Sequence, residues 1–168
     1  QGLFLLAGRA GDTRLANLAP PDLHTLLTQV RAAATSYDMV LLDISAGIHT
    51  QALAFCAAAD KTLLLTTPDP AAFTDAYALL KLLYANHGIA NAHLIVNQAS
   101  AREGDTIHSK LKTAAEHFLG LPDLPYLGHI PPCRQYASAV KLHQLASIAY
   151  PNSPAVDAIA KLAKTLPR

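Results

Sequence analysis

Short apolar runs alternate along this chain with longer stretches in which apolar residues recur at helical spacing. Each apolar run ends at a polar or turn-forming residue, which is typical of buried strands. The predicted strands are residues 3–7, 39–43, 62–67, 92–96 and 124–130. Because these runs are continuously apolar rather than alternating, they favour a parallel sheet that is covered on both faces.

The stretches between these runs predict helices, and some of them begin with proline or with a capping residue such as Asp69. The predicted helices are residues 20–36, 49–59, 71–85, 106–119, 135–145 and 154–166. Residues 100–105 are expected to form a polar loop. The alternation of strand and helix predicts an α/β fold with a mostly parallel sheet and helices on both faces. We find no repeat or linker, and expect residues 1–168 to form a single domain.

The composition of the chain excludes some classes of function. The chain has 168 residues, is 51% hydrophobic and carries a net charge of only +1. Without a basic field, we expect no nucleic-acid partner. No apolar run is long enough to span a bilayer. Cys56 and Cys133 form no C-x-x-C pair, so we interpret them as unreactive core thiols in a reduced, cytoplasmic compartment. The scattered histidines show no metal-binding spacing.

Polar or turn-forming residues stand where four of the predicted strands end. They are Asp43, the segment 66–68, Asn97 with Gln98, and Ile130 with Pro131. In a parallel sheet these ends share the edge at which ligands bind. Two interpretations of Asp43 stay open: a carboxylate near Mg²⁺ and a terminal phosphate, or a cap of the next helix. Asn97 could contact a base edge, since its amide both donates and accepts, or could simply form a turn.

The sequence contains no phosphate-binding loop. Neither G-x-x-x-x-G-K-[ST] nor G-x-G-x-x-G occurs. The segment 8–12 follows a predicted strand but has no lysine. We therefore expect this chain alone to bind ATP poorly. The amphipathic helix at 154–166 favours a cover for the sheet over a helix lying on a membrane surface, which would need more basic and bulkier apolar residues.

A series of motifs runs along nearly the whole chain. It comprises D-I-S-A-G-I at 43–48, A-A-D at 58–60, T-T-P-D-P-A-A-F-T-D-A-Y-A-L-L-K at 66–81, I-V-N-Q at 95–98, R-E-G at 102–104, Y-L-G-H-I-P at 126–131, A-V at 139–140 and S-P-A-V-D-A-I-A at 153–160. In content and order these motifs resemble the MinD/ParA class of deviant-Walker P-loop ATPases. Within that class they most resemble the flagellar number regulators of the FlhG family, also called FleN or YlxH. The T-D-A-Y motif is the most specific, because MinD itself lacks it.

The resemblance implies a three-layer, P-loop NTPase-like (Rossmann-like) fold and an ATP-dependent switch that uses ATP and Mg²⁺. It implies that ATP drives homodimer formation and that a partner stimulates hydrolysis. It also implies a cytoplasmic protein that associates peripherally with the inner face of the plasma membrane through a C-terminal amphipathic helix. The implied partners are the SRP-type GTPase FlhF and components of the flagellar switch.

Site residues follow from the resemblance by motif. Asp43 and Gly47 correspond to the catalytic switch II segment, and Asp43 would lie near Mg²⁺ and the attacking water. Asn97, with Gln98, would contact adenine. Ile130 and Pro131 would line the base.

The chain also departs from the family pattern. The family's phosphate loop precedes everything present here, and its strand occupies the middle of the sheet. We therefore expect this chain to be the C-terminal portion of a MinD/ParA-like ATPase domain and a fragment of a longer protein; otherwise the sheet closes up or a partner fills the gap. Ser45 stands at a usual glycine, Gln98 at a usual arginine, and the segment 132–133 where an aspartate normally follows I-P.

Three functional hypotheses follow. The first is an ATPase switch that regulates flagellar number or placement, inactive as this chain alone. The second is a degenerate, non-hydrolysing binding module that keeps the fold and a partner surface. The third is an amide-forming ligase of the cobyrinic-acid or dethiobiotin kind, which T-D-A-Y and D-I-S-A-G-I match less well.

Overall fold

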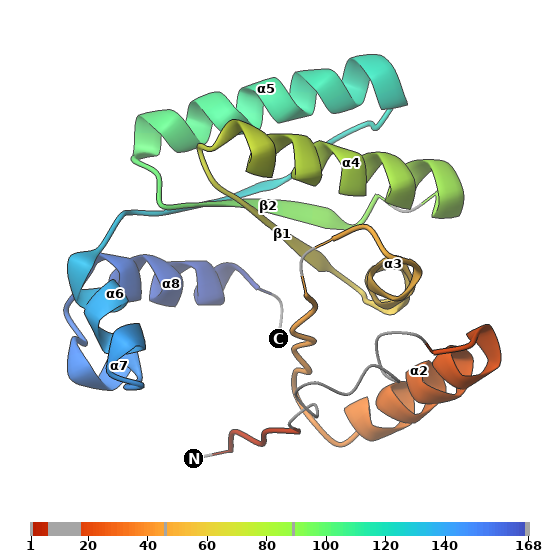
Figure 1. Ribbon diagram of the computed structural model, residues 1–168, viewed down its shortest axis with the longest axis horizontal. Coiled ribbons are helices and arrows are strands. Elements are labelled where there is room, and N and C mark those ends of the chain that lie inside the picture. Colours follow the sequence, from red (N-terminus) through yellow and green to blue (C-terminus); the bar gives the residue numbers. More distant parts are fainter. Residues whose placement is uncertain (1, 7–17, 46, 89, 167–168) are drawn as a thin grey trace. The chain divides into compact units, whose positions relative to one another are not determined.

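A computed structural model describes residues 2–6, 18–45, 47–88 and 90–166, and its ribbon is drawn in Figure 1. The chain divides into two compact units, Gln1–Leu42 and Asp43–Arg168. Each unit is described by itself below. Ala7 and the glycine-containing segment 8–12 lie outside the described residues.

The first unit contains one long helix, α2 (Pro20–Ala34). Proline occupies its first turn, where no backbone donor is needed. Asp22 in the first turn and Arg31 in the last turn complement the helix dipole. The rings of Phe4 and Tyr37 meet edge to face with centroids 5.5 Å apart.

The predicted strands at residues 3–7 and 39–43 are wrong for the residues described there. Neither 3–6 nor 39–43 forms strand hydrogen bonds, and Figure 1 draws neither stretch as a strand arrow. Leu41 is 73% exposed in this segment. A strand needs a neighbour to satisfy its backbone groups, and no described segment pairs with either run. Apolar content alone was therefore insufficient to make them strands.

The second unit is built on a parallel sheet of three strands in the order β1-β2-β3. Its strands are β1 (Thr62–Thr66), β2 (Ala92–Asn97) and β3 (Tyr126–Ile130). Helices α4 (Pro70–His87) and α5 (Ala101–Leu119) pack on one face, and α8 (Pro154–Thr165) packs against β3 on the other (Figure 1). This confirms the predicted α/β fold with helices on both faces.

The main core lies between the sheet and helices α4 and α5. Its largest fully buried members include Leu94, Leu111 and Leu124. A smaller cluster joins Leu53, Cys56 and Leu83 between α3 (Thr50–Ala58) and α4. Burying each such leucine side chain contributes about 1.5–3 kcal/mol. The sheet is thus held firmly from its α4–α5 side.

Local capping decides where the helices begin. Asp69 caps α4, because its Oδ1 accepts from the backbone nitrogens of Ala71 at 2.8 Å and Ala72 at 3.2 Å. Ser100 caps α5 in a capping box with Glu103. The polar loop predicted at 100–105 is therefore wrong. Its S-x-x-E pattern is a helix start, and the helix begins five residues earlier than expected, at Ala101 rather than Thr106.

An irregularity in β3 sends neighbouring side chains to different helices. The register pairs Leu94 with Tyr126 but Ile95 with Gly128, so β3 holds one extra residue there. As a result, Tyr126 contacts Gly104 of α5, whereas a Cβ on Gly128 would meet Leu162 of α8 at 3.3 Å. Because of this bulge, two positions that are two residues apart on β3 face opposite sides of the sheet, Tyr126 toward α5 and Gly128 toward α8.

The chain after β3 forms shorter helices than predicted. The single helix expected at 135–145 is instead α6 (Arg134–Lys141) followed by α7 (Ala146–Ala149). His143, with φ of +52°, reverses the chain between them. In the described residues, no helix is both long and apolar enough to cross a membrane.

Candidate functional site

The ends of β2 and β3 lie side by side, as the sequence predicts. Asn97 pairs in register with Ile130, and the nitrogen of Ala99 donates to the carbonyl oxygen of Ile130 at 3.1 Å. At the neighbouring strand, Thr66 stands opposite Val96. The carboxyl ends of the three strands therefore form one edge, where open parallel sheets bind ligands.

Asn97 shapes a tight turn at this edge. Its Oδ1 accepts from the backbone nitrogen of Gln98 at 2.9 Å, and Gln98 adopts φ of +56°, which is uncommon for a residue with a Cβ. The Nδ2 group of Asn97 makes no hydrogen bond to any described residue. The turn-forming interpretation of Asn97 is thus confirmed, while its amide donors stay available to a ligand. Both interpretations of Asn97 are therefore physically compatible.

Asp43 does not cap the helix that follows it. The N-cap of α3 is His49, whose Nδ1 accepts from the nitrogen of Ala52 at 3.2 Å. Asp43 is exposed and makes no hydrogen bond or ion pair with the described part of the chain. The capping interpretation of Asp43 is therefore wrong. Neither hydrogen bond nor ion pair links Asp43 to Asn97 or Ile130 among the described residues.

The segment after Asp43 is held by His49. A backbone N–H can only donate, so Nδ1 of His49 must be the acceptor and Nε2 carries the proton. Nε2 then donates to Ser45 Oγ at 3.3 Å. Gly47 has φ of +126°, and a Cβ there would lie 3.3 Å from Cδ2 of His49. This position requires glycine. The sequence did not signal the cap, because histidine is not a preferred N-cap residue.

The side chains at these positions could hold only part of a complex of a nucleotide with Mg²⁺. Mg²⁺ is commonly held by one or two carboxylates together with substrate phosphates, and the exposed, unpaired Asp43 suits such a role. The described residues contain no cluster of three or more His, Cys, Asp or Glu side chains that could hold a metal by themselves. Asn97 and Ile130, which were predicted to contact the base, lie side by side at the β2–β3 edge, whereas the sequence has no phosphate-binding motif.

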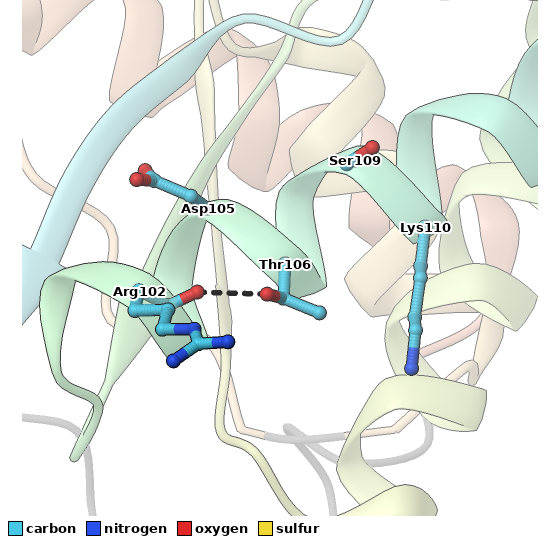
Figure 2. A pocket seen from close by; sticks show the side chains of 5 residues that line it. All are labelled: Arg102, Asp105, Thr106, Ser109 and Lys110. Atoms are coloured by element: carbon cyan, nitrogen blue, oxygen red, sulfur yellow. Dashed lines mark hydrogen bonds between the residues drawn. The ribbon is translucent and has the colours of Figure 1, made fainter.

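A surface hollow lies elsewhere in the described structure, on α5. It has a volume of about 600 Å³. Its lining residues are Arg102, Asp105, Thr106, Ser109 and Lys110. Figure 2 shows that all five side chains project from one helix, with Thr106 Oγ1 bonded to the carbonyl oxygen of Arg102 at 2.8 Å. Because ligand sites are usually concave and enclosed by several elements, we assign no ligand to this shallow hollow.

Sequence comparison finds flagellar relatives. The chain is 30% identical over 155 residues to the antiactivator FleN of Pseudomonas aeruginosa, covering 92% of this chain and 55% of FleN. It is 30% identical over 165 residues to the flagellum site-determining protein YlxH of Helicobacter pylori, covering 96% of this chain and 55% of YlxH. The chain thus spans about half the length of these relatives. No protein-family model matches it.

Structural comparison finds the folds of ParA and MinD proteins. A ParA family ATPase from Chlorobium tepidum matches with a TM-score of 0.72 at 22% identity, covering 94% of this chain and 62% of that protein. A chain of the MinC:MinD cell division complex of Aquifex aeolicus matches with a TM-score of 0.64 at 21% identity, covering 88% of this chain and 61% of the other. At this identity the matches establish the fold, which is the P-loop NTPase-like fold of the ParA and MinD proteins.

Proposed function

We propose that this chain, which is a MinD/ParA-type protein with an FlhG-like sequence, belongs to an ATP-dependent switch that regulates flagellar number or placement. The observation that carries the proposal is its similarity to FleN and YlxH over more than nine-tenths of its length. Residues 1–168 would form the C-terminal portion of the ATPase domain. The phosphate loop would come from a preceding segment of a longer protein.

The site residues take complementary roles in this proposal. Asp43 lies near Mg²⁺ and the attacking water, and Gly47 keeps the switch segment in its required conformation. Two observations support this assignment: Asp43 is exposed and has no partner among the described residues, and Gly47 holds φ of +126°. An unpaired carboxylate can bind a cation or orient water without first breaking a structural contact. The proposed catalytic contribution of Asp43 is therefore electrostatic positioning.

The base side of the proposed site is the β2–β3 edge. Asn97 and Gln98 contact adenine, and Ile130 with Pro131 lines one side of the ring. The free Nδ2 donors of Asn97 support this role, as does the bond from Ala99 to Ile130 that keeps the two strand ends together.

The switch would act through assembly. ATP and Mg²⁺ would favour a homodimer, hydrolysis would release the monomer, and an SRP-type GTPase like FlhF and flagellar switch components would be its partners. Peripheral contact with the inner face of the plasma membrane belongs to the same proposal. The structural similarity of this chain to a chain of the MinC:MinD complex supports this scheme at the level of the fold.

The deciding experiment measures ATP turnover, ATP binding and thermal stability of the complete protein with Asp43→Asn. Turnover should fall by at least about a hundredfold, as for loss of one electrostatic catalytic group. ATP binding and the thermal midpoint should change little, since Asp43 forms no hydrogen bond or ion pair with the part of the chain that the structure describes. The matched control is Asp38→Asn, another exposed aspartate, which should keep full turnover.

Other results would redirect the proposal. Full turnover by Asp43→Asn would remove the catalytic role of Asp43. Binding of ATP without turnover by the unaltered protein would favour the non-hydrolysing binding module. Absence of any ATP binding by the complete protein would contradict the nucleotide switch itself.

A further inference from the structure

The stretch between Asp43 and helix α3 has few contacts of its own. Ile44 packs against the small core cluster between α3 and α4. Beyond it, the described residues up to the start of α3 are exposed. Both side-chain hydrogen bonds made by these exposed residues involve the imidazole of His49. The side-chain contacts that hold the stretch therefore converge on one ring.

The ring of His49 joins the two ends of this stretch. Nδ1 accepts from the nitrogen of Ala52 in the first turn of α3 at 3.2 Å, and Nε2 donates to Oγ of Ser45 at 3.3 Å. The edge of the ring lies close to Gly47, where a Cβ would be 3.3 Å from Cδ2. Because both nitrogens belong to one rigid ring, the bond to Ala52 fixes the tautomer and the direction in which Nε2 donates.

The acceptor of the second bond is not part of the family pattern. Ser45 stands at a usual glycine, which has no side chain to accept a hydrogen bond. Its Oγ has no other hydrogen-bond partner among the described residues. The bond between Ser45 and His49 therefore arises from this chain's own residues, two positions after Asp43.

We propose that His49 is a positioning residue, whose bonds to Ser45 and Ala52 form a bridge that holds Asp43 in a defined place before α3. The bond to Ala52 fixes the start of the helix, and the bond to Ser45 ties the preceding stretch to that start. The His49 bridge is a property of this chain alone, whereas its effect on catalysis rests on the switch function proposed above.

Two substitutions of His49 separate the two bonds. Asparagine places an oxygen where Nδ1 stands and is a preferred N-cap residue, but it has no atom at the position of Nε2. His49→Asn should therefore keep the bond from Ala52 and lose the bond to Ser45. Glutamine carries its amide one bond further from the backbone, so His49→Gln should keep a donor for Ser45 and lose the cap.

The first test measures backbone order parameters by NMR relaxation in the complete protein. The amides of Ser45, Gly47 and Ile48 should have order parameters of about 0.85 in the unaltered protein and below about 0.6 in His49→Asn. Ser45→Ala should give the same loss, and the double variant should add nothing further, because both changes remove one bond. The imidazole nitrogen shifts of the unaltered protein should show the proton on Nε2.

Controls match each substitution. His24→Asn makes the same change at an exposed position on α2, and Ser109→Ala does so on α5. Neither should alter the order parameters of the stretch before α3.

The second test measures ATP turnover by the same variants. His49→Asn should lower kcat about tenfold with little change in KM, because a misplaced Asp43 affects the reaction more than binding. His49→Gln, which keeps the contact with Ser45, should recover part of that loss. A purely structural cap would give the opposite order, with Asn better than Gln.

The outcomes distinguish the bridge from the proposed function. Unchanged order parameters in both His49→Asn and Ser45→Ala would overturn the bridge. Lower order parameters with an unchanged kcat would overturn its role in placing Asp43. If the unaltered protein hydrolyses no ATP, the proposed function fails, and the order parameters still decide whether the bridge exists.

Discussion

The backbone nitrogen of Ala99, two residues beyond the end of β2, donates to the carbonyl oxygen of Ile130, the last residue of β3, at 3.1 Å. Ala99 is fully buried. The bond extends the contact between β2 and β3 into the loop that follows β2, so the turn at Asn97 has a fixed neighbour. A side chain in this turn can be changed without freeing the strand ends, which makes its chemical role testable.

Asn97→Asp distinguishes a turn-forming role from a base-binding role. The carboxylate keeps an acceptor for the nitrogen of Gln98 but removes the Nδ2 donors. The free energy of unfolding should change by less than about 0.5 kcal/mol. ATP binding by the complete protein should weaken about tenfold, the equivalent of one hydrogen bond. Denaturant unfolding and calorimetric titration measure the two quantities.

The matched control for that variant is Asn152→Asp, in an exposed turn before α8, which adds the same charge outside the turn at Asn97. It should leave both stability and ATP affinity unchanged. Unaltered ATP affinity in Asn97→Asp would mean that Asn97 only shapes the turn.

Gly104→Ala should destabilise the protein by about 1–3 kcal/mol. A Cβ at this position would collide with the hydroxyl of Tyr126 and would lie 3.2 Å from Cβ of His129. Tyr126→Phe removes a buried hydroxyl that has no hydrogen-bond partner among the described residues, so alone it should be close to neutral. The double variant should recover part of the loss. Urea unfolding gives all three free energies.

Ser109→Ala tests whether the Gly104 effect comes from contact rather than from helix propensity, since Ser109 is an exposed position on α5. It should be neutral or slightly stabilising. A double variant as unstable as Gly104→Ala would show that the hydroxyl of Tyr126 is not the obstacle.

The contribution of Glu103 to the free energy of unfolding should decrease in acid. Its carboxylate accepts from Ser100 Oγ at 2.6 Å and from the nitrogen of Ser100 at 2.9 Å, and these bonds lower its pKa from an ordinary value of 4.5. The stabilisation is therefore complete above the ordinary pKa and is lost as pH falls through the lowered, folded-state pKa.

Comparing unfolding free energies of the unaltered protein and Glu103→Gln from about pH 7 to about pH 3 isolates this contribution. The advantage of glutamate over glutamine should shrink as pH falls. An advantage that stays constant or grows in acid would contradict the capping-box origin. Asp105→Asn, an exposed neighbour without a hydrogen bond among the described residues, is the control.

Features carried by local chemistry were predictable from the sequence. The strands β1, β2 and β3 and the helix α4 appear close to their predicted positions, and Asp69 caps α4 as expected. The meeting of Asn97 with Ile130 follows from a general property of parallel sheets. In each case the signal lies in adjacent residues, or in a topology that has only one simple form.

Features that depend on partners were not predictable in the same way. The run Met39–Leu42 has a strand's composition but no described neighbour to pair with. The bulge that separates Tyr126 from Gly128 depends on how α5 and α8 approach β3. The start of α5 was predicted wrongly for a different reason. Ser100 and Glu103 form a capping pattern that is recognisable in the sequence, so this helix start was predictable. Cys56 is a buried core thiol as predicted, whereas Cys133, which has no distinguishing pattern in the sequence, is only partly buried.

The outer side of β1 has a practical consequence for the protein in solution. Among the described residues no strand pairs along that side, and Leu65 is 56% exposed. A row of unpaired backbone donors and acceptors beside apolar side chains is a template on which other polypeptides can add. With this side of β1 unpaired, the protein should therefore aggregate readily and bind chaperones. Its soluble yield should fall as its concentration rises.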